Sequence, residues 1–264
     1  MGLRANEFYR ATSLEDAYQK LQEDPKNTIV AGGLWLKKIG SSYNTLIDLS
    51  NLKLDEIKED RHYFYVGSMV SLRDFETSPI VQSLFNGVTA KAIGEVMGPA
   101  FRNTATIGGS VFGRYPFSDV ICALLPLDVT LKFYPEQEMT LVDYLSYKGK
   151  MNAILTEIKI KKDEGKAFYK KVKTTQLDFP MINFSIVRRE DKHYIAVGSR
   201  PMVASLAVNA MKAADDGLPF EEVADIAVQE FQFLDSYNIS AEYRKDLAKV
   251  YIRRGLEEVN KLWN

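Results

Sequence analysis

The sequence predicts an α+β fold, because strand-like runs and helical patterns are segregated in its C-terminal part. Short runs rich in β-branched and aromatic residues come first, and amphipathic helical patterns follow them. The expected strands are 167–172, 181–188 and 194–198, and the expected helices are 204–214, 220–231 and 241–263. Consecutive strands followed by consecutive helices are typical of an antiparallel sheet covered by helices.

The N-terminal part predicts a small βαβ unit. Thr12-Ser-Leu-Glu15 reads as a capping box, in which a hydroxyl and a carboxylate satisfy the first N–H groups of a helix. This helix is expected between Phe8 and Ile29, and strands are expected at 27–31 and 45–49.

The middle of the chain alternates between strands and helices and ends at a charged segment, 161–165. Strands are expected at 62–66, 129–134 and 153–160, and helices at 72–75, 81–96 and 118–125. The sequence therefore predicts three consecutive domains, with bounds 1–54, 55–162 and 165–264.

Composition excludes several classes of protein. The chain has 264 residues, with 34 basic and 35 acidic side chains, so no basic excess points to nucleic acid. No apolar run is long enough to span a bilayer, and the N-terminal residues lack the apolar core of a signal peptide. We therefore expect a cytoplasmic protein with no membrane partner.

The chain also lacks the usual parts of metal and hydrolytic sites. The single cysteine, Cys122, excludes an internal disulfide and alone cannot hold zinc or an iron–sulfur cluster. His62 and His193 have no histidine at ligand spacing and no obvious serine and acid beside them. We expect no metal ligands and no catalytic side chains in this chain.

Two Gly-Gly pairs follow β-branched runs: Gly32–Gly33 and Gly108–Gly109. Without side chains, consecutive N–H groups at a strand end can form a concavity that binds a diphosphate. Each pair alone is also compatible with a tight turn or a β-bulge. The repeated pattern favours ligand binding.

Better-known phosphate loops do not fit these residues. Gly113 is followed by Arg114 and Tyr115 where a P-loop needs Lys and then Ser or Thr, and no Gly-x-Gly-x-x-Gly fingerprint is present. Asp119 is a further polar candidate. It can cap the helix that it precedes, accept hydrogen bonds from ligand hydroxyls or a ring nitrogen, or do both.

These segments resemble the FAD-binding subunit of the molybdenum hydroxylases, the xanthine dehydrogenase and carbon monoxide dehydrogenase family. The resemblance runs essentially from end to end. The matching segments are Tyr9-Arg-Ala-Thr-Ser-Leu-Glu-Asp-Ala17, Ala31-Gly-Gly-Leu-Trp-Leu36, Phe101-Arg-Asn-Thr-Ala-Thr-Ile-Gly-Gly-Ser110 and Tyr115-Pro-Phe-Ser-Asp119. The chain departs from the family pattern at Leu34 and Trp35, where smaller or polar residues are usual.

The resemblance implies a two-part FAD-binding domain of the PCMH/vanillyl-alcohol-oxidase type, followed by a C-terminal α+β domain. FAD would be bound non-covalently, since neither histidine lies in the matching loops, with its pyrophosphate on the two Gly-Gly loops. The residues implied in cofactor binding are Ile29, Val30, Ala31, Gly32, Gly33, Leu34, Trp35, Leu36, Thr106, Ile107, Gly108, Gly109, Ser110, Asp119, Leu155, Thr156 and Lys170.

The resemblance further implies an oxidoreductase subunit that transfers electrons. A partner subunit would hold molybdopterin, a small [2Fe–2S] subunit would reduce the FAD, and NAD or another acceptor would oxidise it. A stand-alone flavin reductase of the same fold and a flavin-free scaffold or assembly subunit are the alternatives.

Overall fold

The computed structural model describes residues 3–39 and 42–261. The chain forms two compact units, and neither is continuous in sequence. Unit 1 comprises Met1–Phe75, Pro99–Gly113 and Val129–Ile160; unit 2 comprises Glu76–Gly98, Arg114–Asp128 and Lys161–Asn264. These units group the residues by packing, whereas the three consecutive domains expected from the sequence remain a prediction.

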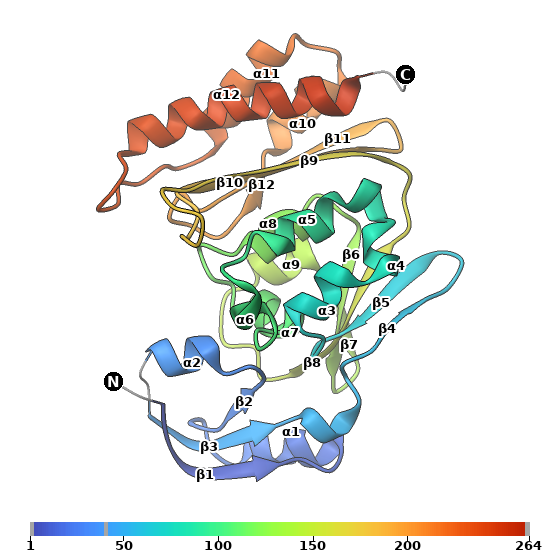
Figure 1. Ribbon diagram of the computed structural model, residues 1–264, viewed down its shortest axis with the longest axis vertical. Helices are drawn as coiled ribbons and strands as arrows, with labels where there is room; N and C mark the ends of the chain where they lie inside the picture. The colour runs from blue at the N-terminus through green and yellow to red at the C-terminus, as the bar shows by residue number, and fades with distance from the viewer. Residues whose placement is uncertain (1–2, 40–41, 262–264) are drawn as a thin grey trace. The chain divides into compact units, whose positions relative to one another are not determined.

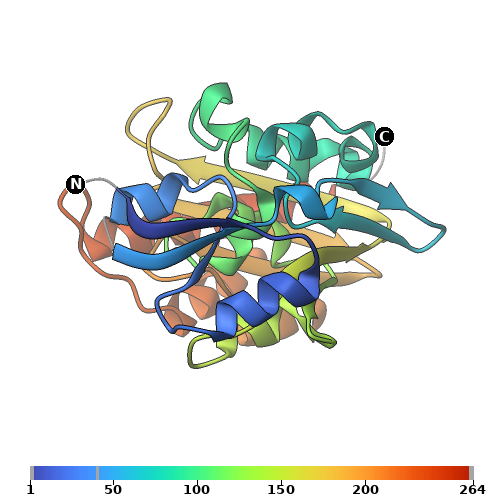
Figure 2. The ribbon, with the colours of Figure 1, turned by 90° about the horizontal axis from the view of Figure 1, so that it is seen from below.

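Unit 1 begins with a three-stranded parallel sheet. The strands β1 (Arg4–Arg10), β3 (Ser42–Asp48) and β2 (Thr28–Val30) lie in that order. The helix α1 (Leu14–Gln22) connects β1 to β2 and lies against this sheet (Figure 2). It buries Ala17 and Leu21 in a cluster with Ile47 of the sheet. The predicted βαβ unit is confirmed.

The start of α1 differs in detail from the predicted capping box. Ser13, not Thr12, is the N-cap, and its hydroxyl accepts a hydrogen bond from the N–H of Asp16. The reciprocal carboxylate belongs to Asp16, not Glu15, and accepts the N–H of Thr12 at 2.7 Å. The Tyr9 hydroxyl also donates to Asp16, which ties the end of β1 to the helix.

Unit 1 also contains a five-stranded sheet. Its order is β4 (Ile57–Glu59), β5 (Tyr63–Gly67), β8 (Ile154–Lys161), β6 (Val129–Tyr134) and β7 (Gln137–Thr140). The strands expected at 62–66, 129–134 and 153–160 are confirmed to within one residue. The remaining elements of this unit are short: α2 (Leu34–Ile39), η1 (Ser50–Leu52), α3 (Leu72–Thr77), α6 (Pro99–Arg102), α7 (Ile107–Phe112) and α9 (Leu141–Ser146).

Unit 2 is built on a four-stranded antiparallel sheet. Its order is β12 (Ser205–Leu206), β11 (Lys192–Gly198), β10 (Ile182–Arg189) and β9 (Gly165–Val172). The helices α10 (Val208–Asp215), α11 (Phe220–Glu230) and α12 (Ala241–Asn260) cover one face (Figure 1). Phe184 and Ile186 of β10 pack there against Ile252 and Leu256 of α12. The α+β class is confirmed.

Two predicted helix bounds in unit 2 need correction. The helix expected over 204–214 begins only at Val208, because Ser205 and Leu206 pair with β11. The helix expected over 241–263 ends at Asn260, and Leu262 and Trp263 lie outside the described residues.

Short helices line the other face of the unit 2 sheet (Figure 1). The helix α5 (Val88–Gly94) contacts β9, and α8 (Asp119–Leu124) contacts β10 and β11. The region expected as mostly helical, 81–96, is divided into α4 (Pro79–Gln82), η2 (Leu84–Gly87) and α5. Gly87 adopts a φ of 77°, which ends one helix and starts the next. No helix in the described part of the chain is long and apolar enough to cross a membrane.

Candidate functional site

The two Gly-Gly loops lie against each other in unit 1. A Cβ atom on Gly32 would stand 1.9 Å from the carbonyl oxygen of Thr104, which belongs to the segment before the second pair. No side chain fits in that space. The structure therefore brings together two segments that are far apart in the sequence.

The first loop offers backbone donors. Gly33 has a φ of 67° and turns the chain from β2 into α2. Within the residues that the structure describes, the N–H groups of Gly32, Gly33 and Leu34 donate to no protein acceptor. Leu34 belongs to the first turn of α2, where N–H groups lack intrahelical partners. The first loop therefore keeps open backbone N–H donors, although bulky side chains stand where the family usually has smaller or polar ones.

The second loop differs from the prediction. Thr104–Ile107 is not a strand, and Gly108 and Gly109 lie in the first turn of the helix α7. Their N–H groups are already bonded: that of Gly108 donates to Ser68 O at 2.9 Å, and that of Gly109 donates to Thr106 Oγ1 at 3.1 Å. The N–H groups of Ile107 and Ser110 are bonded to Val70 O and Thr106 O. This loop cannot present consecutive free donors.

The strand β8 joins this region through Ser68. The N–H of Ser68 donates to the carbonyl of Thr156 at 2.9 Å, and the carbonyl of Ser68 accepts from Gly108. Leu155 and Thr156 are both buried, and the Thr156 hydroxyl donates to Lys132 O. Of the predicted residues, the structure therefore gathers Gly32–Leu34, Thr106–Ser110 and Thr156 into one part of unit 1.

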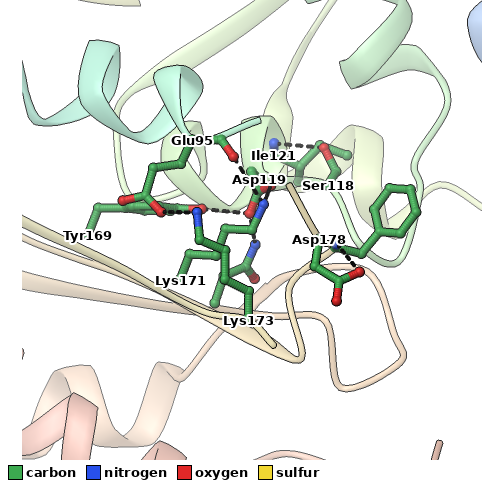
Figure 3. Close-up of polar contacts among 10 residues, drawn as sticks. Glu95, Ser118, Asp119, Ile121, Tyr169, Lys171, Lys173 and Asp178 are labelled. Carbon is green, nitrogen blue, oxygen red and sulfur yellow. Dashed lines mark hydrogen bonds and ion pairs between the residues drawn. The ribbon is translucent and has the colours of Figure 1, made fainter. Parts of the chain in front are cut away.

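Asp119 lies in unit 2 and is not a helix cap. Ser118 is the N-cap of α8 and accepts the N–H of Ile121, whereas Asp119 is the first helical residue. One carboxylate oxygen of Asp119 accepts the Tyr169 hydroxyl at 2.7 Å and the Asn183 amide at 2.9 Å. The other oxygen accepts the Lys171 ammonium at 2.9 Å (Figure 3).

The Asp119–Lys171 ion pair is buried. The two side chains are 4% and 1% exposed. Lys171 of β9 also donates to the carbonyl of Glu95, and Lys173, just after β9, bonds to the Glu95 carboxylate at 3.1 Å (Figure 3). Both lysines therefore bond to the C-cap residue of α5. Burial, reinforced by the Asp119 charge, raises the pKa of Tyr169 well above its ordinary value, which keeps this phenol a donor.

Lys170 lies on the opposite face of β9. Successive strand residues point to opposite faces, so Lys170 is separated from Asp119 although Lys171 contacts it. Lys170 is exposed, and its ammonium lies 5.6 Å from the ring centre of Tyr251 in α12. A role of Lys170 in cofactor binding remains a prediction.

Sequence reasoning missed Ser68, Tyr169, Lys171 and Asn183. Period-two alternation along β9 would have placed Tyr169 and Lys171 on one face, which was the available signal for these two. Ser68 and Asn183 had no such signal, because their contacts join segments distant in the sequence. Neither histidine lies in the loops: His62 lies in the turn before β5, and His193 bonds to Asp215 and Asn260.

Comparison with known proteins identifies the family of the chain. Residues 4–161, more than half of the chain, match the family described as the FAD binding domain in molybdopterin dehydrogenase. The nicotinate dehydrogenase FAD-subunit of Eubacterium barkeri is 27% identical over 70% of this chain and 69% of its own length. The glyceraldehyde dehydrogenase medium chain of Sulfolobus acidocaldarius is 24% identical over 96% of this chain and 97% of its own.

Solved structures share the fold over nearly the whole chain. A chain of the carbon monoxide dehydrogenase of Hydrogenophaga pseudoflava superposes with a TM-score of 0.87 at 21% identity, covering 98% of each chain. A chain of the quinoline 2-oxidoreductase of Pseudomonas putida 86 superposes with a TM-score of 0.85 at 20% identity, again covering 98% of each. The chain belongs to the family of FAD-binding domains of molybdopterin dehydrogenases and is an FAD-binding oxidoreductase subunit of the molybdenum hydroxylase type.

Proposed function

We propose that this chain transfers electrons within a multi-subunit molybdenum hydroxylase of the xanthine dehydrogenase kind. A [2Fe–2S] subunit would reduce its FAD, and NAD or another acceptor would oxidise it, while molybdopterin would reside on a large partner subunit. The names of the relatives, an FAD-subunit and a medium chain of dehydrogenases, support this division of labour. A single cysteine, Cys122, supports placing the iron–sulfur cluster on another chain.

The open donors of the first loop carry the proposal. Three successive N–H groups, at Gly32, Gly33 and Leu34, have no protein acceptor in the described chain, and the first two residues bring no side chain. Such an arrangement suits the oxygens of a diphosphate, which would approach the backbone closely. FAD supplies the redox chemistry when bound, and the residues of this chain bind and orient it.

The other predicted residues enter the proposal in different ways. Thr106 and Gly108–Ser110 would shape the site, because their backbone donors are already bonded. The side chain of Asp119 has three protein donors on its two oxygens, so its proposed role is to hold unit 2 in a competent conformation. Ile29–Ala31, Trp35, Leu36 and Ile107 complete the two proposed loops, and Leu155, Thr156 and Lys170 are proposed to lie near the flavin.

Acid precipitation of the purified chain tests the cofactor. We expect a flavin absorption spectrum, and release of about one FAD per chain into the acid supernatant, as non-covalent binding requires. Flavin retained in the precipitate would contradict non-covalent binding. The absence of flavin, even after incubation with excess FAD, would contradict the proposal and favour the scaffold alternative.

Two single substitutions, one at a glycine of the first loop and one at a glycine outside it, test the role of this loop. Gly33→Ala places a side chain at a φ of 67° and 3.3 Å from a Val30 methyl carbon, so we expect FAD affinity to fall by tenfold or more. Gly217→Ala is the control, since Gly217 has a φ of 83° with nothing within 4 Å of the added atom. Equal FAD affinity in the two variants would contradict the role of the first loop.

Turnover separates the electron-transfer subunit from a stand-alone reductase. The isolated chain loaded with FAD should oxidise NADH slowly, and addition of both the molybdopterin subunit and the [2Fe–2S] subunit should produce electron flow from substrate to acceptor. Rapid NADH oxidation by the chain alone, with free flavin as the electron acceptor, would favour the stand-alone flavin reductase.

A further inference from the structure

The side-chain hydroxyl of Ser68 has no hydrogen-bond partner in the described structure. Ser68 is 5% exposed, and its Oγ is among four buried side-chain atoms without a partner there. A buried hydroxyl that forms no hydrogen bond destabilises a folded protein, so its presence needs an explanation.

Ser68 lies beside the second Gly-Gly loop, and this position explains why its hydroxyl has no partner within the chain. Its N–H donates to Thr156 O and its carbonyl accepts from Gly108 N, so its backbone is fixed between β8 and α7. A Cβ on Gly108 would stand 2.6 Å from the Cβ of Ser68, which shows that the serine side chain lies directly against this loop.

The Ser68 hydroxyl differs from the other donors of this loop, because those donors already form hydrogen bonds within the protein. The N–H groups of Ile107, Gly108, Gly109 and Ser110 are all bonded within the protein, and the Ser110 hydroxyl donates to Thr106 O. The Ser68 hydroxyl lies beside the second loop, and no group in the described chain accepts a hydrogen bond from it.

We propose that the Ser68 hydroxyl donates a hydrogen bond to an oxygen of the FAD diphosphate. The inference rests on the proposed binding of the diphosphate at the paired loops. Backbone N–H groups of the first loop would then hold one side of the diphosphate, and a serine hydroxyl, fixed by two backbone hydrogen bonds, would hold the other.

The substitution Ser68→Ala tests this inference through two readouts with opposite signs. The FAD-free variant should unfold at a temperature about 2 °C or more above the unsubstituted protein, because an unpartnered hydroxyl is removed from the interior. Its dissociation constant for FAD, measured by quenching of flavin fluorescence, should rise about tenfold, because a hydrogen bond to a charged group is lost.

The variant Ser199→Ala is the matched control. Ser199 is 4% exposed, and its hydroxyl is also buried without a partner, but it lies in unit 2 at the end of β11. It should gain thermal stability without a change in FAD affinity. Loss of affinity in both variants to the same extent would overturn the specific role of Ser68.

The remaining outcomes separate this inference from the proposed function. If the unsubstituted chain binds FAD and Ser68→Ala binds it equally well, the inference is wrong and the flavin function stands. If the unsubstituted chain binds no FAD, the proposed function fails, and the inference fails with it.

Discussion

Glycine is required at positions 32 and 108, because neighbouring backbone leaves no room there for a side chain. A Cβ on Gly32 would meet the Thr104 carbonyl at 1.9 Å, and one on Gly108 would meet the Ser68 carbonyl at 2.4 Å. The sequence pattern favours the approach of a ligand to both glycines. The structure shows that at these two positions another segment of the same chain makes the close approach.

The substitution Gly32→Ala should therefore destabilise the chain even without FAD. The added methyl group forces the loop away from Thr104, and overpacking of this kind costs about 1–3 kcal/mol. Urea unfolding of the FAD-free protein measures the change. Gly98→Ala is the control, because its added atom meets only a Leu177 carbon at 4.0 Å. An equal stability of the two variants would contradict this account.

The substitution Asp119→Asn should be among the most damaging in unit 2. It leaves the Lys171 ammonium, 1% exposed, without its anionic partner, and breaking a buried pair in this way costs about 3–5 kcal/mol. The control is Lys173→Met, which removes a pair whose side chains are 21% and 34% exposed and should cost about 1 kcal/mol or less. Urea unfolding measures the free energy of unfolding of each variant. Similar losses of stability in the two variants would contradict the expected effect of burial.

At the level of whole elements, the sequence predicted the long, regular segments and misassigned short ones, of which Thr104–Ile107 is the clearest. The strands of unit 2 and the helices α11 and α12 were predictable because each repeats its period over several residues. Three of the four residues in Thr104–Ile107 are β-branched, a composition that favours a strand. Instead, the Thr106 hydroxyl accepts the N–H of Gly109 and starts α7, so a local cap outweighs β propensity.

The candidate site was predictable only where contacts are local or repeated. The two Gly-Gly loops were found by their shared pattern, although their mutual contact through Gly32 and Thr104 was not visible in the sequence. The Asp119 cluster required knowledge of how α5, α8, β9 and β10 pack together. A one-residue difference along β9 separates the predicted Lys170 from Lys171, which contacts Asp119.

The β4–β5 hairpin contains a pH-sensitive contact at its turn. The Tyr65 hydroxyl donates to Asp60 at 2.7 Å, and this bond, together with the N–H groups of His62 and Tyr63, lowers the pKa of Asp60 to about 2. The same bond raises the pKa of Tyr65 to about 12. The stabilisation is therefore present between the two ordinary pKa values, and it is lost as the pH falls towards 2 or rises through 12.

The substitution Tyr65→Phe should raise the pKa of Asp60 towards its ordinary value of 3.8, since the largest cause of the shift is removed. The free-energy difference between the unsubstituted protein and the variant should shrink as the pH falls from about 5 to about 2. Urea unfolding at several pH values, or carboxyl NMR of Asp60, measures this. Tyr63→Phe is the control, and an unchanged pKa of Asp60 in Tyr65→Phe would contradict the assignment.

At the scale of the whole molecule, each unit has its own core and its own polar feature. Unit 1 contains the paired Gly-Gly loops, and unit 2 contains the buried Asp119–Lys171 pair, which joins α8 to β9. FAD has a diphosphate and a flavin ring as distinct recognition elements. The proposed function has the free backbone donors of unit 1 bind the diphosphate, so ligands that carry only part of FAD should separate the contributions of the diphosphate and the ring.

Thermal unfolding in the presence of ADP or riboflavin tests this assignment. A ligand that binds only the folded state stabilises it by about 2.7 kcal/mol at a concentration one hundred times its dissociation constant. ADP carries the diphosphate and riboflavin does not, so at equal concentration ADP should raise the unfolding temperature more. Gly33→Ala should reduce the effect of ADP while leaving that of riboflavin nearly unchanged, since it alters only the first loop. A larger shift with riboflavin than with ADP would place the main binding energy on the ring and contradict a diphosphate anchor in unit 1.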